Sequence, residues 1–234
     1  MSEANDIIYG VHPVAEALKN PRRKIYALKA SKNAADRLAD DIAARGITPE
    51  IVHPNVLDRA LGADAVHQGL LMEARPLPQP RLDQIERSGV VVLLDQVTDP
   101  HNVGAILRTC AAFNVTALVA TARHSPEASA VLFKSASGAY EHVPFVKVTN
   151  LARAMAELKE YGFRILGLDS EAPEDIADVE RTPPLAIVLG AEGKGLRQLT
   201  RESCDHLVRL DLTGPIRSLN VSNACAVTLY ALTR

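Results

Sequence analysis

Leu185-Ala-Ile-Val-Leu189 leads directly into Gly190-Ala-Glu-Gly-Lys-Gly-Leu196, and this passage decides the fold. The apolar run predicts a strand that is buried on both faces, as in a parallel sheet covered by helices. The three glycines that follow allow unusual backbone conformations and let a ligand approach main-chain amides. Since open α/β sheets bind ligands at the carboxyl ends of their strands, the passage predicts a ligand site at that edge.

Apolar runs of the same kind recur through the C-terminal part of the chain. They predict strands at Val90–Leu94, Thr116–Val119, Phe163–Leu168, Leu185–Leu189 and Leu207–Leu210. Between them, capping residues predict helices that begin at Asp99-Pro100, at Ser125-Pro126 and at Asn150, the last one closing at Gly162. The acidic stretch 171–180 is expected to be a solvated loop. This alternation of strands and helices predicts an α/β fold with a parallel sheet.

A proline-rich passage, Arg75-Pro-Leu-Pro-Gln-Pro-Arg81, separates this part from a shorter one, because such a passage favours an extended connector. We therefore expect an N-terminal domain over residues 1–74, a linker over 75–84 and a C-terminal domain over 85–234. The N-terminal part reads as a small α/β module. Its predicted elements are a helix near Val14–Leu18, a strand at Ile25–Leu28, a helix at Ala34–Arg45 closed by Gly46, and strands at Glu50–Val52 and Leu70–Met72.

The composition is that of a folded globular protein. Of 234 residues, 47% are hydrophobic and 23% charged, which leaves enough apolar area to offset the entropy of the chain. A net charge of −2 gives no overall attraction to a polyanion, so any contact with nucleic acid has to come from local basic patches. Aromatic residues make up only 4%, which argues against a single-strand binder built on stacking platforms.

Cysteines, histidines and hydropathy exclude several classes of protein. Cys110, Cys204 and Cys225 are widely spaced, which favours buried, reduced thiols over a disulfide framework. The histidines are scattered and form no metal-binding motif, so we expect no metal site. The longest aliphatic run, Val90–Leu94, is too short to cross a bilayer, and the N-terminus is polar and acidic where a secretory signal is basic and then apolar. These features predict a soluble, cytoplasmic protein.

Three clusters carry candidate chemistry, and the first is Asp99-Pro-His-Asn-Val-Gly-Ala-Ile-Leu-Arg-Thr109. Gly104 and Arg108 are four residues apart and therefore share one face of the predicted helix. A glycine that admits close approach would then lie beside a guanidinium suited to phosphate or ribose oxygens. Taken alone, however, this segment is explained as well by a capped helix with a surface arginine.

The second cluster is the glycine-rich turn quoted above, whose order is neither that of a dinucleotide-binding loop nor that of a Walker loop. A plain turn would explain its glycines but not Glu192. The third cluster is Leu210-Asp-Leu-Thr-Gly-Pro-Ile-Arg-Ser-Leu-Asn-Val-Ser-Asn-Ala224. Ser218 or Asn220 could cap a following helix, but capping explains one polar residue and not the whole Ser-Leu-Asn-Val-Ser string.

In order and spacing, these clusters resemble the SpoU/TrmH branch of the SPOUT methyltransferases. Tyr9-Gly-Val-His-Pro-Val-Ala-Glu-Ala17 is similar to the substrate-binding domain of that family, so the resemblance covers nearly the whole chain. It implies a C-terminal parallel-sheet SPOUT domain with a deep trefoil knot, an exception to the usual absence of knots, and a small N-terminal α/β domain with an L30e-like ribosomal-protein fold. It also implies a homodimer formed through the knotted domain.

The activity that the resemblance implies is transfer of a methyl group from S-adenosylmethionine to a ribose 2′-hydroxyl of structured RNA. The most similar branch acts on a guanosine of 23S ribosomal RNA. Two other hypotheses stay open: the substrate could be transfer RNA, or the chain could be a non-catalytic RNA-binding dimer that assists ribosome assembly. A nucleotide-binding dehydrogenase is a distant further alternative, because the phosphate-binding fingerprint is missing.

Matched positions extend the resemblance to single residues. Those implied to bind the cofactor are Gly190, Leu210 and Leu219, with Leu189, Ala191 and Gly195 beside them. Those implied to be catalytic or to hold the substrate are Asn102, Arg108, Glu192, Ser218 and Asn220. Two departures are visible: Leu210-Asp-Leu212 replaces the more usual Ile-Pro-Met, and Asn223 follows Ser222 where the family often has a small apolar residue.

The resemblance assigns Arg108 to activating the hydroxyl, yet a guanidinium with a pKa above about 12 is a poor general base. We therefore expect Arg108 to stabilise the developing alkoxide and to grip a neighbouring phosphate, while Glu192 orients Arg108 or the ribose. Two basic patches could dock RNA: Arg22-Arg-Lys24 with Lys29 and Lys32, and a second patch of Lys194, Arg197 and Arg201. The RNA-binding residues predicted from these patches are Arg22, Arg23, Lys24, Lys194 and Arg197.

Overall fold

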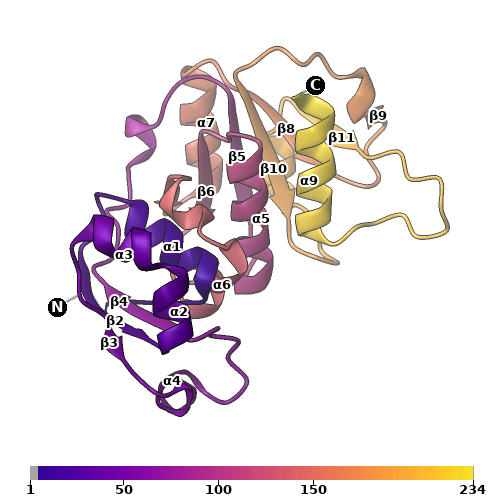
Figure 1. The fold of residues 1–234 in the computed structure, drawn as a ribbon. Helices are drawn as coiled ribbons and strands as arrows, with labels where there is room; N and C mark the ends of the chain where they lie inside the picture. Colours follow the sequence, from indigo (N-terminus) through magenta and orange to yellow (C-terminus); the bar gives the residue numbers. More distant parts are fainter. Residues whose placement is uncertain (1–4, 234) are drawn as a thin grey trace.

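The computed structural model describes residues 5–233, so the first four residues of the polar N-terminus lie outside it. A smaller N-terminal lobe and a larger C-terminal lobe lie side by side, and each has its own sheet (Figure 1). In the part of the chain that is described, no helix combines the length and the apolar character that a membrane span requires.

The N-terminal lobe packs helices against a four-stranded sheet of order β1-β4-β2-β3. Its strands are β1 Asp6–Tyr9, β2 Ile25–Ala30, β3 Glu50–Ile51 and β4 Leu70–Ala74. Its helices are α1 Val11–Lys19, α2 Lys32–Arg37, α3 Ala39–Arg45 and α4 Pro54–Leu61. The one helix predicted over Ala34–Arg45 is wrong, because the chain leaves the helical conformation at Leu38, whose side chain is buried in the core. Gly46 closes α3 in the left-handed conformation, as predicted.

The C-terminal lobe is built on a seven-stranded sheet of order β7-β6-β5-β10-β8-β11-β9, in which all neighbouring strands are parallel. The strands are β5 Val90–Asp95, β6 Ala117–Thr121, β7 Phe145–Val148, β8 Arg164–Leu168, β9 Glu174–Asp175, β10 Leu185–Gly190 and β11 His206–Arg209. The five predicted strands are confirmed to within a residue or two. From β5 the chain adds β6 and β7 on one side, whereas β8, β10 and β11 lie on the other. The order therefore changes direction between β5 and β10, where open α/β sheets form their ligand sites.

Helices cover both faces of this sheet (Figure 1). They are α5 Pro100–Ala112, α6 Ala130–Ala136, α7 Leu151–Glu160, α8 Gln198–Glu202 and α9 Val221–Leu232, with short 3₁₀ turns η1 Leu82–Gln84, η2 Ala139–Glu141 and η3 Ile176–Asp178. Within β5, Val91 and Leu93 pack in the cluster that contains α7, while Val92 and Leu94 pack in the cluster that contains α5 and α9. A strand buried on both faces explains why the sequence shows an unbroken apolar run there.

Two predictions about connecting segments are wrong. No helix begins at Ser125-Pro126; the chain stays irregular until Ser129, whose side chain accepts a hydrogen bond from the Leu132 amide and caps α6. The acidic stretch is not a solvated loop, because it forms edge strand β9 and turn η3 and buries Ile176 and Val179 against the core. Apolar residues are interspersed among the acidic residues of this stretch, and the side chains of Ile176 and Val179 point into the core.

The proline-rich connector is held against the C-terminal lobe. Leu77 and Leu82 are buried, and the Nε2 atom of Gln79 donates a hydrogen bond of 2.7 Å to the hydroxyl of Tyr140. The connector is therefore itself packed in a fixed position and does not serve only as a spacer between the lobes.

Candidate active site

A pocket of about 340 Å³ opens at the carboxyl ends of β8 and β10. The loop after β10 forms one wall, and the long segment between β11 and α9, which Figure 1 shows extending to the side of the larger lobe, forms another. The residues expected to bind the cofactor all line this pocket: Leu189, Gly190, Ala191, Gly195, Leu210 and Leu219. Two sequence clusters separated by about twenty residues thus fold against each other, as expected.

The loop after β10 can be built only with glycine at its key positions. A Cβ atom on Gly190 would lie 2.3 Å from the carbonyl carbon of Gly195 and 2.5 Å from the amide nitrogen of Leu196, and neither backbone atom can move aside easily. Gly193 and Gly195 have positive φ angles of 76° and 65°. The Gly195 amide donates a hydrogen bond of 2.9 Å to the Ala191 carbonyl, which closes the turn and presents its backbone to the pocket.

Three polar side chains from different parts of the chain meet beside this pocket. The Oε1 atom of Glu192 accepts hydrogen bonds from the Nδ2 atoms of Asn102, at 3.1 Å, and of Asn220, at 2.6 Å. The Nδ2 atom of Asn220 also lies 3.0 Å from the Oδ1 atom of Asn102. We call these residues the amide–carboxylate triad. They join the start of α5, the glycine loop and the start of α9, and so hold these three segments in one arrangement beside the pocket.

Asn220 is also the residue that caps α9. Its Oδ1 atom accepts hydrogen bonds from the amide and the hydroxyl of Ser222, at 2.9 and 2.6 Å. Because one amide both caps the helix and bonds to Glu192, its orientation is fixed from two sides. Of the two candidate caps, Asn220 takes this role, and Ser218 lines the pocket instead.

Arg108 does not line this pocket. It is exposed on α5, six residues after Asn102 and therefore about 9 Å farther along the helix axis. It lines a second groove between the lobes, together with His12, Glu16 and His142. Gly104 shares its helix face, as predicted, but faces α6, since an added Cβ atom there would lie 2.8 Å from the Leu132 carbonyl oxygen. The partners of Glu192 are two asparagines and not Arg108.

Comparison with known families matches almost the whole chain. Residues 89–230 match the model of the SpoU rRNA methylase family, and residues 7–80 match the model for RNA 2′-O ribose methyltransferase substrate binding. The chain is 40% identical over 242 residues to the 23S rRNA (guanosine-2′-O-)-methyltransferase RlmB of Vibrio vulnificus (strain CMCP6), which covers 99% of this chain and 97% of the relative.

This chain belongs to the SpoU methylase family. It is also 37% identical over 238 residues to the RlmB protein of Pasteurella multocida (strain Pm70), across 97% of each chain. The solved structure of the SpoU methyltransferase AviRb from Streptomyces viridochromogenes, in complex with AdoMet, has the same fold, with a TM-score of 0.82 at 23% identity over 98% of this chain and 89% of that one. The A. aeolicus TrmH/SpoU tRNA modifying enzyme matches 62% of this chain and 73% of that one, with a TM-score of 0.55 at 30% identity.

The departure at residues 210–212 keeps one wall of the pocket of this SpoU protein apolar. Leu210 and Leu212 both line it, whereas Asp211 between them does not. The substitution of Ile-Pro-Met by Leu-Asp-Leu therefore replaces two apolar wall residues by two others and places the polar one outside.

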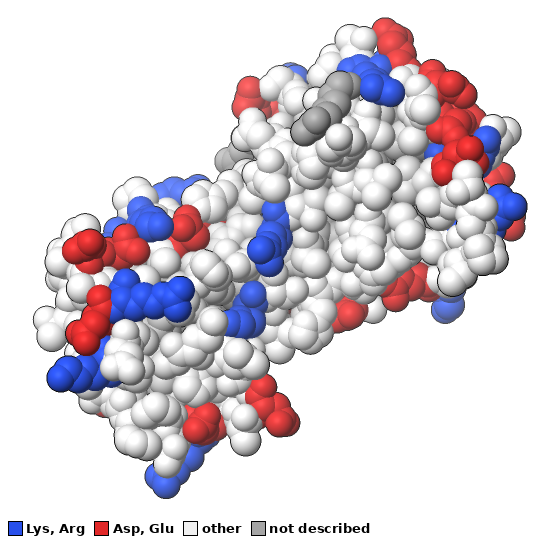
Figure 2. Space-filling view, turned by 45° about the vertical axis from the view of Figure 1, so that its right-hand side comes forward, with Lys and Arg blue, Asp and Glu red and all other residues white. Residues whose placement is uncertain are grey.

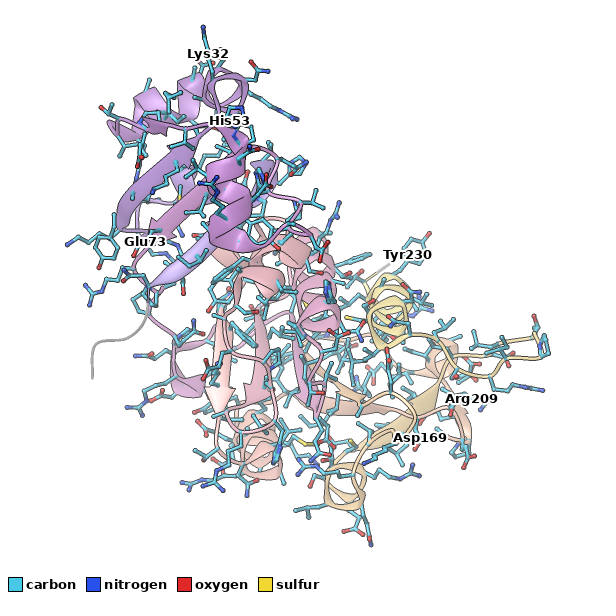
Figure 3. The ribbon with its side chains drawn as sticks, turned by 90° about the horizontal axis from the view of Figure 1, so that it is seen from below. Lys32, His53, Glu73, Asp169, Arg209 and Tyr230 are labelled. Carbon is cyan, nitrogen blue, oxygen red and sulfur yellow. The ribbon has the colours of Figure 1, made fainter. Side chains whose placement is uncertain are left out.

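Several pocket residues were not predicted from the sequence. They are Leu168, Asp169, Ser170, Gly193, Leu212, Arg217, Val221 and Ala224. The first three directly follow β8, so the rule that ligands bind at carboxyl ends of strands could have found them once β8 was known to neighbour β10. Asp169 forms an ion pair with Arg201. In Figure 3, Asp169 and Arg209 lie at the same side of the sheet, at the ends of β8 and β11.

One predicted RNA contact is wrong. Arg23 has no exposed surface, and it forms ion pairs of 2.5 Å with Asp6 and 2.6 Å with Glu141. A guanidinium enclosed in this way holds the lobes together and cannot reach an RNA phosphate. Its neighbours Arg22 and Lys24 are exposed, as is Lys194 in the glycine loop. Figure 2 shows lysine and arginine side chains on both lobes and in the saddle between them.

Arg197, the other predicted RNA contact in the glycine-loop patch, is anchored from behind. Asp95, fully buried at the end of β5, accepts hydrogen bonds from the backbone amide of Arg197 at 2.9 Å and from its Nε atom at 2.7 Å. The side chain of Arg197 is nevertheless about half exposed. The buried carboxylate therefore fixes the position of a guanidinium whose outer nitrogens face outward.

The thiols have the environments of unreactive groups. Cys110 and Cys225 are buried, as predicted, and Cys204 is partly buried. A hydrogen bond with Cys225, together with burial, raises the pKa of the Cys110 thiol well above its usual range. Burial raises the pKa of Cys204 to about 12. Among residues 5–233, no three histidine, cysteine or carboxylate side chains gather closely enough to hold a metal ion.

Proposed function

We propose that this chain transfers the methyl group of S-adenosylmethionine to a ribose 2′-hydroxyl of RNA, and that its substrate is a guanosine of 23S ribosomal RNA in the cytoplasm. The observation that carries the proposal is the meeting of the glycine-loop pocket and the amide–carboxylate triad at the carboxyl end of β10. Its membership of the SpoU family and its similarity to RlmB proteins over nearly their whole length support the same substrate.

The pocket residues fit the methyl donor. A volume of about 340 Å³ is within the range of roughly 300–1,000 Å³ for small-molecule sites. Leu189, Leu210 and Leu219 offer apolar walls for a purine, and the loop backbone offers polar groups for a ribose. Arg217 supplies a positive charge for the carboxylate of the amino-acid end, and Asp169, which is paired with Arg201, lines the same pocket. S-adenosylmethionine, when bound, supplies a methyl group on a positively charged sulfur.

The chain's own residues supply positioning. Transfer requires the 2′-hydroxyl in line with the methyl group, and holding two reactants in that geometry removes an entropy loss from the barrier. The triad fixes the start of α5 and the start of α9 around the pocket, so Asn102, Ser218 and Asn220 can hold the ribose by hydrogen bonds without first having to be ordered. Glu192 orients the two amides and keeps a negative charge beside a site that a cationic cofactor enters.

We also propose a homodimer, formed through a face that includes α9. Exposed apolar side chains gather on this helix and on the segment before it: Ile216, Leu219, Val227 and Tyr230. Tyr230, 51% exposed, projects from α9 away from the sheet in Figure 3, and the larger lobe presents a broad face with few charged side chains in Figure 2. Such apolar patches mark interaction surfaces. The trefoil knot implied by the family resemblance belongs to the same proposal.

A dimer gives Arg108 a route to the reaction. In one chain its guanidinium lies outside the pocket, in the groove between the lobes. We therefore assign Arg108 to the ribose and phosphate held at the pocket of the second subunit, where it stabilises the developing alkoxide. Arg108 then has the role that we expected from the sequence, but it acts at the pocket of the other subunit and not at that of its own.

The alternatives fit less of the chain. The tRNA modifying enzyme from A. aeolicus matches 62% of it, whereas the RlmB relatives match 97–99%. A non-catalytic RNA-binding factor would not need the small-molecule pocket beside the triad, which the glycine loop, Leu210 and Leu219 line.

The test uses labelled S-adenosylmethionine with 23S ribosomal RNA and transfer RNA from cells that lack this protein, followed by mass spectrometry of the modified nucleoside. We expect one 2′-O-methylguanosine in 23S RNA. Label found only in transfer RNA would establish the second substrate, and cofactor binding by calorimetry without transfer to any RNA would establish the non-catalytic factor.

A further inference from the structure

Another hollow, of about 260 Å³, lies at the same edge of the sheet as the cofactor pocket, beyond the carboxyl ends of β6 and β7. We call it the cationic hollow. The residues that define it are Thr121, Arg123, His124, Asn150, Arg197 and Leu199. The sequence assigned none of these residues to such a hollow; Arg197 was expected to contact RNA in the basic patch with Lys194 and Arg201.

The hollow has one sign of charge. Arg123 and His124 are exposed on the connection after β6, and none of the described residues that line the hollow is a carboxylate. The Nε atom of Arg197 is bonded to the buried carboxylate of Asp95, so this ion pair adds no net charge to the hollow. Within residues 5–233, the two outer nitrogens of Arg197 form no hydrogen bond or ion pair, so its planar fork keeps donors for an oxyanion.

Helix α7 begins at this hollow. Its cap is Asn150, whose Oδ1 atom accepts a hydrogen bond of 3.0 Å from the Arg153 amide. Leu151 and Ala152, the first two residues of the ten-residue helix, line the hollow. The amides of a first helical turn lack partners within the helix, and the helix dipole adds a partial positive charge there. Both effects favour an anion at this position.

Thr121 gives an independent indication of a ligand. It lines the hollow and is 4% exposed, yet its Oγ1 atom has no hydrogen-bond partner among residues 5–233. A buried hydroxyl without a partner costs about 1–3 kcal/mol, and such groups are rare in folded proteins. An oxyanion in the hollow could accept a hydrogen bond from this hydroxyl.

The hollow and the cofactor pocket lie on the same edge of the sheet, which indicates that the anion belongs to the RNA substrate. Neighbouring strands are about 4.8 Å apart, so the ends of β6 and β7 lie roughly 5–10 Å from the end of β5, where the helix bearing Asn102 begins. The cofactor pocket lies on the other side, at β8 and β10. The pocket for the methyl donor and the hollow for an anion therefore lie along the same edge of the sheet, one at β8 and β10 and the other at β6 and β7.

We propose that the cationic hollow binds a backbone phosphate of the RNA strand next to the ribose that is methylated. This inference rests on the proposed function. Phosphate contacts fix the register of a nucleic acid without reading its sequence, and such a contact would bring one 2′-hydroxyl to the triad. Leu199, 60% exposed at the rim, offers an apolar surface to the adjoining nucleoside.

Arg123→Ala tests the proposal, with Arg87→Ala as the matched control. Arg87 is an exposed arginine before β5, at the opposite edge of the sheet, so both variants lose one charge. We expect Arg123→Ala to weaken binding of a 23S RNA fragment about tenfold and to lower the slope of log affinity against log salt by about 0.7–1. We expect Arg87→Ala to change neither, and both variants to bind S-adenosylmethionine like the wild type.

Thr121→Val provides a second test that does not depend on net charge. Valine has nearly the shape of threonine and removes only a hydroxyl without a partner, so we expect unchanged or higher thermal stability. RNA affinity should nevertheless fall severalfold, which a merely structural role of Thr121 does not explain.

The results separate the two proposals. A wild-type protein that methylates no RNA contradicts the proposed function. A wild-type protein that methylates RNA, while Arg123→Ala and Arg87→Ala show the same salt slope, overturns the phosphate site and leaves the function intact. Loss of S-adenosylmethionine affinity in Arg123→Ala, or binding of inorganic phosphate in the hollow that RNA does not displace, also overturns it.

Discussion

The Nδ2 atom of Asn220 lies 2.6 Å from the Oε1 atom of Glu192, 28 residues earlier in the chain. The same carboxylate oxygen accepts a hydrogen bond from Asn102, 90 residues earlier still. One acceptor thus connects the three sequence clusters, and the geometry explains why Glu192 stands in a turn that glycines alone could form. A carboxylate accepts stronger hydrogen bonds than a neutral amide does, so its charge should matter as well as its position.

Replacing Glu192 should therefore separate charge from position. Glu192→Gln keeps an acceptor oxygen and should lower single-turnover methyl transfer about tenfold, whereas Glu192→Ala removes both hydrogen bonds and should lower it about 100-fold. Glu202→Gln, which removes an exposed carboxylate bonded to Gln198 on α8, is the control and should retain wild-type rates. Equal activity of Glu192→Ala and wild type would contradict the role of the triad.

Gly190→Ala should abolish cofactor binding. Its Cβ atom would fall 2.3 Å from backbone at Gly195, so the loop has to open, and we expect a loss of about 1–3 kcal/mol in the free energy of unfolding. Gly214→Ala is the matched control in the facing segment, because a Cβ atom there meets nothing within 4 Å. Calorimetric titration with S-adenosylmethionine checks both variants, and an unchanged affinity in Gly190→Ala would show that the loop does not hold the cofactor.

Arg108→Ala should bind S-adenosylmethionine nearly as the wild type does and show almost no turnover. If Arg108 acts on the pocket of the second subunit, mixing the Arg108→Ala variant with the Glu192→Ala variant should restore activity. About a quarter of the wild-type rate is expected, since half of the dimers are mixed and each of these holds one complete site. Activity of the mixture no higher than that of either variant alone would place Arg108 and Glu192 in the same site.

The sequence predicted those parts of the fold that depend on local pattern. The unbroken apolar run of β5 indicated a strand covered on both faces, and its side chains do pack in two separate clusters. Shorter elements escaped prediction for physical reasons. β7 and β9 have four and two residues, and β9 is hidden by the acidic charges around it. Such edge strands are defined by the neighbour they pair with, which periodicity does not reveal.

The candidate site was predictable where a motif dictates backbone geometry and unpredictable where burial decides. Glycine positions 190 and 195 had to form a tight turn, and the turn lines the pocket. Arg22 and Arg23, in contrast, are equivalent in sequence, yet one is exposed and the other fully buried between two carboxylates. Asp6 lies 17 residues before Arg23 and Glu141 lies 118 residues after it. The residues next to Arg23 in the sequence therefore do not indicate that its guanidinium is buried in ion pairs.

Asp205 should make stability depend on pH in the acid range. Burial acts to raise its pKa, but hydrogen bonds from the Lys159 ammonium and the Ile165 amide outweigh burial and lower it below its usual value. A carboxyl with a lowered pKa in the folded state stabilises above its unfolded pKa, near about 3.9, and this contribution is lost as the pH falls through the folded pKa.

Asp205→Asn should therefore be less stable than wild type at pH 7, by less than about 1 kcal/mol because the side chain is one-third exposed and screened by solvent. The difference should shrink as the pH falls toward 3 in urea unfolding curves. A difference that stays constant across this range would mean that the hydrogen bond geometry matters and the charge does not.

Among the ion-paired lysines and arginines of residues 5–233, Arg23 should contribute most to the free energy of unfolding, because its side chain is fully buried between two carboxylates. Its removal takes the opposite charge away from two buried carboxylates, Asp6 and Glu141, which costs about 3–5 kcal/mol. Since Asp6 lies on β1 and Glu141 on η2, the same change should weaken the attachment of the lobes to each other. Arg23→Lys should recover little, because one ammonium cannot form the paired hydrogen bonds that Glu141 receives from the Nε and Nη2 atoms of Arg23.

Urea unfolding of Arg23→Ala, Arg23→Lys and Arg22→Ala measures this contribution. Arg22 is the matched control, being adjacent, exposed and of the same type, and its loss should change the free energy of unfolding by no more than about 0.5 kcal/mol. If Arg23→Ala were as stable as Arg22→Ala, the buried ion pairs would not hold the lobes together.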